Sequence, residues 1–241
     1  MNAAAGATAD TQRAPPAENL RPTAPDPLPR TWFERDPVAL AVALLGQLVV
    51  REDAGRLRIG RIVETEAYAG TDDRASHARA GRTRRTEPMF GPAGHAYVYL
   101  VYGMHHCLNV VAETDGCPSA VLIRALEPVE GRAVMRVARG APSVADDRLL
   151  AGPALACAGM SIDRSLDGHD LTRGSLLWVA PDQAFSNAHA DGLPAIVAGP
   201  RIGVAYAGPG WADRPWRCGL AGSPSLSRTF PSQAGATQPT V

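Results

Sequence analysis

The segment from Arg61 to Asn109 concentrates carboxylates, tyrosines and histidines between apolar residues. Its first part, RIVETEAY, alternates with a period of two, the spacing of side chains on one face of a strand. The face that carries two carboxylates and a tyrosine consists of Ile62, Glu64, Glu66 and Tyr68. A carboxylate beside an aromatic pocket is suited to activating a water molecule. The segment therefore predicts a hydrolytic site with a tyrosine-lined wall.

A second alternating stretch follows at residues 95–101. It groups His95, Tyr97 and Tyr99 on one face and apolar residues on the other. Gly103 is expected to end this strand and to leave Tyr102 at its tip. The tyrosines are thus predicted to form part of the pocket, with one aromatic side chain at its edge.

Arg124 interrupts a nearly continuous apolar run, residues 119–126, that is typical of a central strand. A buried guanidinium without an anionic partner would cost several kcal/mol. The sequence offers Glu66 or Glu64 as that partner.

Five arginines fall within twelve residues after the first strand, with no acid among them. They are Arg74, Arg79, Arg82, Arg84 and Arg85, and their segment is called the arginine loop below. The chain as a whole carries 24 bases and 24 acids, so a polyanion site must come from local clustering. A solvated loop and a DNA-binding loop remain equally open readings of this run.

All 24 bases are arginines, because the chain contains no lysine. Schiff-base catalysis by a side chain and a lysine-bound phosphate loop are therefore excluded. The four cysteines, Cys107, Cys117, Cys157 and Cys218, show no metal-ligand spacing and are expected to be reduced. No metal site or other cofactor is predicted. No apolar run approaches the roughly 20 residues of a membrane span, so we expect a soluble, cytoplasmic protein.

The fold class expected from the order of elements is α+β, with one compact domain in which helices surround a mixed, largely antiparallel sheet. Helices are expected to begin after Asp36, with Pro37 in the first turn, and at residues 128–137 and 153–160. Strands are expected at residues 47–51, 57–68, 95–101, 108–112, 119–126, 176–179 and 201–205. Residues 1–29 are interpreted as a disordered arm rich in proline and alanine, residues 30–228 as the catalytic domain, and residues 229–241 as a polar tail.

The order of seven motifs resembles the alkyladenine (3-methyladenine) DNA glycosylase family in its bacterial form. The motifs are RIVETEAY, SHA, MFGP, GHAYVYLVYGMHHCLNV, AVLIRALEP, GP before a helix, and PRIGV, and the resemblance covers roughly Leu28 to Arg228. It implies a monofunctional glycosylase that needs no metal and hydrolyses the N-glycosidic bond of alkylated or deaminated purines in duplex DNA. Departures from the family pattern occur at Thr86 and Cys218.

The resemblance also assigns roles to individual positions. Glu66 matches the general base that deprotonates the attacking water, and Arg124 matches the arginine that helps to hold that water. Tyr102 matches the side chain that intercalates where the nucleotide has left the helix. Positions that match the base pocket are Tyr68, His77, Tyr99, Asn109, which discriminates against the amino group of guanine, and Ile202, through its backbone carbonyl. Backbone contacts to DNA are expected from Arg79, Arg82, Arg84 and Arg85.

General chemistry supports these roles. A purine inside a duplex exposes no glycosidic carbon, so the nucleotide must be extruded, at a cost of a few kcal/mol. An aromatic wedge such as Tyr102 would offset part of that cost. An alkylated purine is cationic, and a tyrosine face attracts a cation by roughly 0.5 to 2 kcal/mol. The lesion itself is left open among 3-methyladenine, 7-methylguanine, hypoxanthine and ethenoadenine.

Two other function classes remain as alternatives. A metal-dependent hydrolase could use Glu64, Glu66, His77 and His95, although the usual ligand spacings are missing. A protein that recognises distorted DNA without chemistry could use the arginine loop and Tyr102. For the preferred interpretation, we expect a monomer that acts on damaged purines in duplex DNA, at the nucleoid when bound, and that binds with strong salt dependence.

Overall fold

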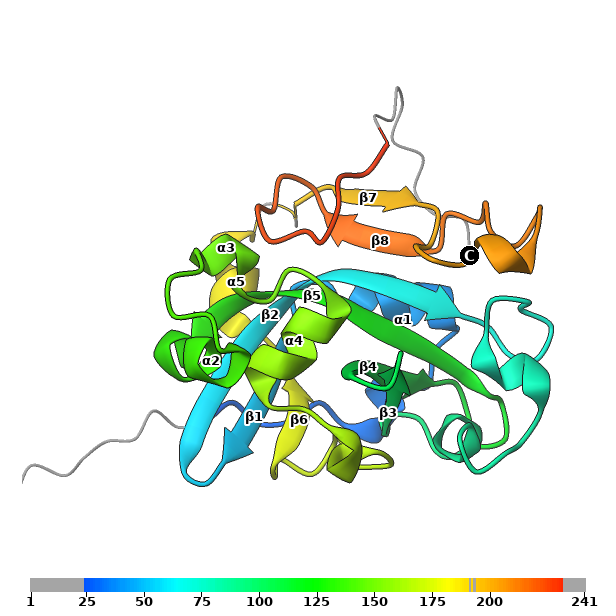
Figure 1. Ribbon diagram of the computed structural model, residues 1–241, viewed down its shortest axis with the longest axis horizontal. Coiled ribbons are helices and arrows are strands. Elements are labelled where there is room, and N and C mark those ends of the chain that lie inside the picture. Colours follow the sequence, from blue (N-terminus) through cyan, green and yellow to red (C-terminus); the bar gives the residue numbers. More distant parts are fainter. Residues whose placement is uncertain (1–23, 191, 193, 232–241) are drawn as a thin grey trace, which may run out of the picture.

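Eight strands pair into one sheet in the computed structural model, which describes residues 24–190, 192 and 194–231. They are β1 (Leu48–Asp53), β2 (Arg56–Tyr68), β3 (Ala96–Val101), β4 (His105–Ala112), β5 (Ser119–Glu130), β6 (Leu177–Ala180), β7 (Ile196–Gly199) and β8 (Arg217–Leu220). The order is β3-β4-β5-β2-β1-β6, with β8 beside the second half of β2 and β7 beyond it. All pairings between these strands are antiparallel, and Figure 1 shows β7 and β8 together along the top of the molecule. The predicted α+β fold with a largely antiparallel sheet is confirmed.

In the described part of the chain, five α-helices accompany the sheet: α1 (Pro37–Ala43), α2 (Arg132–Arg139), α3 (Asp146–Leu149), α4 (Pro153–Met160) and α5 (Gln183–Ala188). Short 3-10 helices are η1 (Arg30–Trp32), η2 (His77–Ala80), η3 (Glu87–Phe90), η4 (Arg164–Leu166) and η5 (Ala205–Ala207). Helix α1 packs on β2 and β5, whereas α4 packs on β4 and β5. In Figure 1, α2 and α4 lie in front of the long β2 and β5 strands.

Helix α1 begins as its sequence predicts. The Oδ1 atom of Asp36 accepts hydrogen bonds from the backbone N–H groups of Val38 and Ala39, at 2.8 and 3.1 Å. These bonds satisfy two donors that a helix start leaves free, and Pro37 at the first position loses no donor. Leu40 is fully buried, so the capped end fixes the helix against the sheet.

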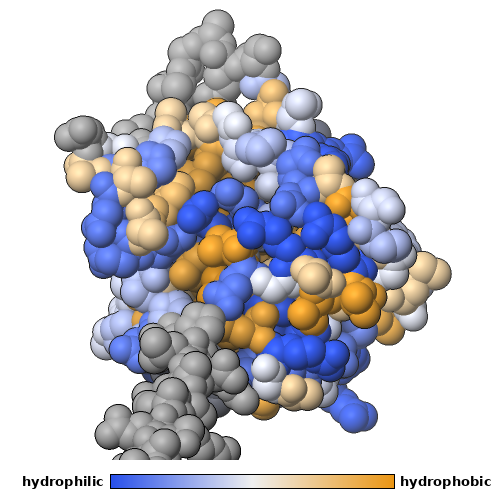
Figure 2. Space-filling view, turned by 90° about the vertical axis from the view of Figure 1, so that its left-hand side faces the viewer, coloured by the Kyte–Doolittle hydropathy of each residue, from blue (hydrophilic) through white to orange (hydrophobic). Residues whose placement is uncertain are grey.

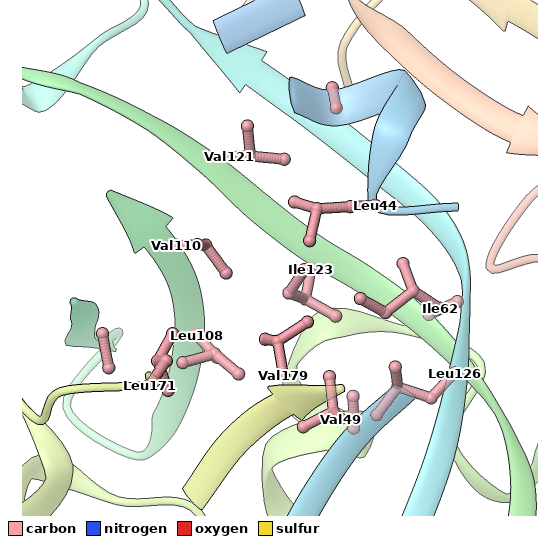
Figure 3. Packing of buried hydrophobic residues seen from close by; sticks show 14 of the residues in the cluster. Leu44, Val49, Ile62, Leu108, Val110, Val121, Ile123, Leu126, Leu171 and Val179 are labelled. Carbon is pink, nitrogen blue, oxygen red and sulfur yellow. The ribbon is translucent and has the colours of Figure 1, made fainter. Parts of the chain in front are cut away.

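The main core lies between α1, α4 and the central strands. Figure 3 shows Leu44, Ile62 and Ile123 among the aliphatic side chains that meet there, together with residues of β1, β4 and β6. Each such side chain contributes about 1.5–3 kcal/mol when it is removed from water. This core holds β2 and β5 side by side, and these two strands carry Glu64, Glu66 and Arg124.

The register between β2 and β5 shifts at three places, and two of the shifts lie beside the carboxylates. Ile62 pairs with Leu126 and Glu64 with Ala125, so Val63 is an extra residue in β2. Because Thr65 then pairs with Ile123, Arg124 is an extra residue in β5. Bulges turn side chains away from strict alternation. Ile62 therefore joins Val63 in the main core, and its predicted place beside the two carboxylates is wrong.

Two element predictions are corrected by the structure. The helix expected over residues 128–137 begins only at Arg132, because β5 runs on to Glu130 and Gly131 turns the chain at φ +80°. A Cβ atom at Gly131 would lie 2.4 Å from the carbonyl oxygen of Leu57, so glycine is required at this turn. The strand expected over residues 201–205 is a bend leading into η5, and the strand of this region is β7, just before it.

The predicted arm and tail are described only in part. Residues 1–23 and 232–241 lie outside the described residues. Within the expected arm, the carbonyl of Pro25 accepts a hydrogen bond from the Trp178 indole at 2.8 Å, and Leu28 bonds to the backbone of β6. Within the expected tail, Phe230 lies 3.7 Å from the guanidinium of Arg217. The packed part of the chain thus includes residues 25–28 and 230.

The described surface is mixed in character. Figure 2 shows the side that faces left in Figure 1, where hydrophilic residues cover much of the face and hydrophobic residues lie between them. Among the described residues, no helix combines the length and the apolar character needed to cross a membrane.

Candidate active site

A cavity of about 220 Å³ opens between the ends of β2, β3, β4 and β5 and the loop around Ile202. Every residue that the sequence assigned to the base pocket lines it: Tyr68, His77, Tyr99, Asn109 and Ile202. Arg124 lines it as well, and Tyr102 reaches it from the turn between β3 and β4. Lining residues that the sequence reasoning missed include Met89, Leu122, Pro153, Val204 and Tyr206. They are apolar or aromatic residues without a distinctive spacing, so the sequence held no signal for them.

Glu66 is completely buried, and its three hydrogen-bonding or ionic partners all line the cavity. Its Oε1 atom accepts a hydrogen bond from the backbone N–H of Ile202 at 2.7 Å and lies 3.2 Å from Nη1 of Arg124. Its Oε2 atom accepts a hydrogen bond from the Tyr68 hydroxyl at 2.8 Å. Burial raises the pKa of the Glu66 carboxyl above its ordinary value, while Arg124 and the two hydrogen bonds oppose that rise.

Arg124 connects both acidic residues of β2. Its Nε atom donates to Oε1 of Glu64 at 3.1 Å, and its Nη1 atom faces Glu66. The sequence left open which glutamate would be its partner, and the structure shows both. The bulge at Arg124 explains this geometry, because an extra residue in β5 aims the guanidinium at the neighbouring strand.

Glu64 is held from the side of β8 and the chain that follows it. Its carboxylate accepts hydrogen bonds from Nη1 of Arg217 at 3.1 Å and from the backbone N–H and hydroxyl of Ser227, at 2.6 and 2.9 Å. With Arg124 as a fourth donor, the Glu64 carboxylate is bonded by three residues, and three of the four donors share its Oε1 atom. Glu64 thus fixes Arg124 and is itself not free to act on a substrate.

His77 forms the polar edge of the cavity. Its Nε2 atom lies 3.4 Å from Nη2 of Arg85, which can only donate, so Nε2 is the acceptor and Nδ1–H donates to the Tyr97 hydroxyl at 3.0 Å. The ring meets Tyr99 edge to face, with 4.6 Å between centroids. Burial, reinforced by the charge of Arg85, lowers the pKa of His77 to about 4. The imidazole is therefore neutral at physiological pH.

Asn109 is buried, whereas Tyr102 is exposed to solvent. The Asn109 amide is buried and donates to the carbonyl of Tyr97 at 3.0 Å, which fixes its orientation across β3 and β4. Tyr102 is 91% exposed, and its backbone is left-handed at φ +51°. The next exposed apolar side chain is Met104, so an apolar tip projects from this turn.

The arginine loop surrounds η2 and is mostly exposed. Arg82 is bound by the carboxylate of Glu87 through both Nε and Nη2, and Arg79 donates to the carbonyl of Arg74. Arg84 and Arg85 line a shallow hollow with Arg164. Thr86, one of the departures from the family pattern, closes the loop by donating to the carbonyl of Gly81 at 2.8 Å.

The four residues of the alternative metal site are not brought together. Both glutamates face arginines, His77 faces Tyr97, and His95 contacts Arg30 and the carbonyl of Pro92. Across residues 24–190, 192 and 194–231, no three His, Cys, Asp or Glu side chains converge as metal ligands would.

A family model described as Methylpurine-DNA glycosylase (MPG) matches residues 31–224. This chain belongs to the methylpurine-DNA glycosylase family. The enzyme is a hydrolase of N-glycosyl bonds, and its family acts in the base excision repair of damaged DNA.

Individual relatives agree with this family. A protein of Anaeromyxobacter dehalogenans strain 2CP-1 is 47% identical over 87% of this glycosylase and 89% of its own length. A protein of Methanocella arvoryzae is 47% identical over 85% of this chain and 97% of its own, and one of Carboxydothermus hydrogenoformans is 48% identical over 73% and 88%. Each carries the name 3-methyladenine DNA glycosylase as a provisional assignment.

Proposed function

We propose that this glycosylase extrudes an alkylated purine from duplex DNA into the cavity and hydrolyses its N-glycosidic bond with a water molecule activated by Glu66. The observation that carries the proposal is the environment of Glu66. Its Oε1 atom is occupied by Ile202 and Arg124, whereas Oε2 has one protein partner, Tyr68, and an acceptor position left for water. A carboxyl whose pKa is raised by burial is a stronger base than an exposed one.

Extrusion would be assisted by Tyr102. An exposed aromatic ring at the mouth of the cavity can enter the stack that the nucleotide leaves, as apolar wedges do in other bent duplexes. Phosphate contacts from Arg79, Arg84 and Arg85 would hold the DNA beside it, with Arg82 contributing where it leaves Glu87. Tyr68, His77, Tyr99 and Asn109 would then enclose the base.

The transition state would carry positive charge on the sugar, which a carboxylate next to the cavity stabilises. Arg124 would keep Glu66 and the water aligned, and the contact of Ile202 with Glu66 runs through its backbone N–H. The carbonyl role expected for Ile202 stays a prediction.

Cationic purines fit this site better than neutral ones. A neutral base such as hypoxanthine must be protonated as it leaves, yet the titratable groups of the wall are poor acids near neutrality. His77 has a pKa of about 4 and is already neutral, while burial holds the pKa values of Tyr68 and Tyr99 above their usual range. A 3- or 7-alkylated purine already carries its charge and needs only the activated water.

The test is single-turnover base release from duplexes that contain one 7-methylguanine or one hypoxanthine, with chelator present. We expect wild type to release free base and leave an intact abasic strand, faster for 7-methylguanine, and Glu66→Gln to lose this activity while it still binds the lesion. Glu127→Gln is the matched control, because Glu127 pairs with Arg61 away from the cavity.

Three results would contradict the proposal. Release by Glu66→Gln at the wild-type rate would remove Glu66 as the base. Loss of wild-type release in chelator would favour the metal-dependent alternative. Lesion binding by wild type without any release would favour a damage-recognition protein.

Because the substrate is DNA, we propose that the enzyme is cytoplasmic and acts at the chromosome. We also propose that it acts as a monomer. The residues that line the cavity and the exposed Tyr102 at its mouth all come from a single chain. Sedimentation of the enzyme with and without a lesion duplex should give one protein per DNA, and a stable dimer would contradict it.

A further inference from the structure

A buried ion pair that the sequence analysis did not identify lies directly behind the wall of the cavity. Asp73 and Arg201 have fully buried side chains and are joined by two contacts, one of them 2.9 Å between Nη2 and Oδ1. Asp73 also accepts hydrogen bonds from the backbone N–H groups of Ala69 and Ala75. A paired charge that is entirely removed from water requires such dense bonding, because it is costly to desolvate.

Arg201 is linked to both uncharged donors of Glu66. Its Nη1 atom donates to the carbonyl of Ala67 at 2.9 Å, between Glu66 and Tyr68 in β2, and its guanidinium lies 4.8 Å from the Tyr68 ring. Ile202, whose backbone N–H donates to Glu66, is the next residue in the chain. One side chain therefore restrains the Tyr68 hydroxyl through its ring and the Ile202 amide through the backbone.

Aromatic residues support Arg201 from the other side. Its guanidinium lies 5.0 Å from the Trp216 ring, and Nη2 donates to the carbonyl of Trp211 at 3.2 Å. Arg214 in turn lies over both tryptophans, at 3.8 and 4.4 Å. Arg201 is not among the residues that line the cavity, and its contacts lead to it through Tyr68 and Ile202, which do line it.

We propose that Arg201, held by Asp73, is a positioning residue that aligns the two uncharged hydrogen-bond donors of Glu66, the Tyr68 hydroxyl and the Ile202 amide. The inference rests on the proposed role of Glu66 as the base. It differs from a purely structural role for the ion pair, because misaligned donors change the acidity of Glu66 and not only the amount of folded enzyme.

The sign of the effect follows from the two hydrogen bonds. Both lower the pKa of Glu66, so their loss raises it, and the active carboxylate then forms only at higher pH. Other titratable or charged groups that interact with Glu66 are Glu64, Tyr68, Tyr99, Cys107, Arg124 and Tyr206. The pKa values of the tyrosines and of Cys107 are raised above their usual values, so these groups do not titrate on the acid side of neutrality.

The experiment measures the single-turnover rate of 7-methylguanine release from about pH 5 to about pH 8. This lesion leaves without being protonated, so the acid limb of the profile reports the base. The variants are Arg201→Lys, which keeps the charge but loses the planar fork, and Asp73→Asn, which removes the partner. The matched control is Arg61→Lys, because Arg61 also pairs with a buried aspartate, Asp182, and lies over an aromatic ring, Phe185, away from the cavity.

Arg201→Lys and Asp73→Asn should move the midpoint of the acid limb upward, with rates about tenfold lower on that limb for a shift of one pH unit. Binding of the lesion duplex should remain near the wild-type value, and Arg61→Lys should keep the wild-type midpoint. In Asp73→Asn, the loss of a nearby negative charge would by itself lower the pKa of Glu66. An upward shift of the midpoint in this variant therefore indicates misaligned donors and not the lost charge.

Lower rates with an unchanged midpoint in the folded variants would overturn the inference and leave the ion pair a structural role. Thermal unfolding identifies the folded variants, and the two ends of the pair provide two independent chances to obtain one. Failure of the proposed function looks different, because Glu66→Gln would then release base and wild type would show no acid limb from Glu66.

Discussion

The hydroxyl of Tyr68 donates a hydrogen bond to the carboxylate of Glu66, 2.8 Å away on the same face of the same strand. A residue that walls the base pocket is thereby also a partner of the proposed base. In the proposed mechanism, substrate contact and water activation are coupled through one side chain, so that a change in one is expected to alter the other.

Tyr68→Phe tests this coupling. The variant keeps the aromatic wall but removes one donor that lowers the pKa of Glu66, so the pKa of the carboxyl should rise. The acid limb of 7-methylguanine release should move to higher pH, while lesion binding changes little. A profile that coincides with that of wild type would show that the hydroxyl does not support the base.

Glu66→Gln should affect stability in a pH-dependent way. The pKa of Glu66 is raised in the folded state above the ordinary value of 4.5, so wild type is favoured while the carboxyl is protonated and loses that contribution as pH rises through the folded pKa. The glutamine variant has no such dependence. Its thermal midpoint relative to wild type should therefore increase from about pH 4.5 towards neutrality. A difference that decreases over this range would contradict the raised pKa.

Acidification should lower the stability of the folded protein through His77, whereas through Glu66 it should raise it. The pKa of His77 falls from 6.5 to about 4 on folding, because burial and Arg85 disfavour the imidazolium. The neutral imidazole therefore contributes stability that is present above pH 6.5 and is lost as pH falls towards 4. Urea unfolding should show that His77→Gln loses less stability than wild type across this window. NMR titration of the ring should give the low midpoint directly, and a midpoint near 6.5 would contradict the burial effect.

Local patterns in the sequence predicted the start of α1, the alternation of β2 and the charged partners of Arg124. They failed where the fold depends on pairing between distant segments. The extra residues Val63 and Arg124 exist only as offsets between two strands, so neither strand alone reveals them.

The same reason explains the missed ion pair. Asp73 and Arg201 are 128 positions apart, and the PRIGV motif that contains the arginine drew attention only to Ile202. A signal was available in principle, because an arginine between Pro200 and Ile202 in an apolar segment calls for an anionic partner. The sequence could not say that Asp73 would be that partner.

Substitutions of Tyr102 should affect the stability of the protein and its rate of base release separately. The φ of +51° at Tyr102 favours glycine, because a residue with a Cβ atom is strained there by about 1–2 kcal/mol, so Tyr102→Gly should have a thermal midpoint equal to or above that of Tyr102→Ala. Both variants lose the proposed wedge and should release base from duplex DNA more slowly than wild type. Release from a single-stranded lesion, which needs no extrusion, should be nearly unchanged and serves as the control. An equal loss on both substrates would mean that Tyr102 acts on the chemistry instead.

Glu87 is expected to limit the proposed contribution of the arginine loop to DNA binding. Its carboxylate binds Arg82 through Nε and Nη2, and both side chains are more than half exposed. Glu87→Gln should remove a repulsive charge and release Arg82 to contact a phosphate, so that binding of undamaged duplex tightens. One added phosphate contact should steepen the slope of log affinity against log salt by about 0.9. Glu113→Gln, a change of the same charge outside the loop, provides the comparison. An unaltered slope in Glu87→Gln would indicate that Arg82 does not reach the DNA backbone.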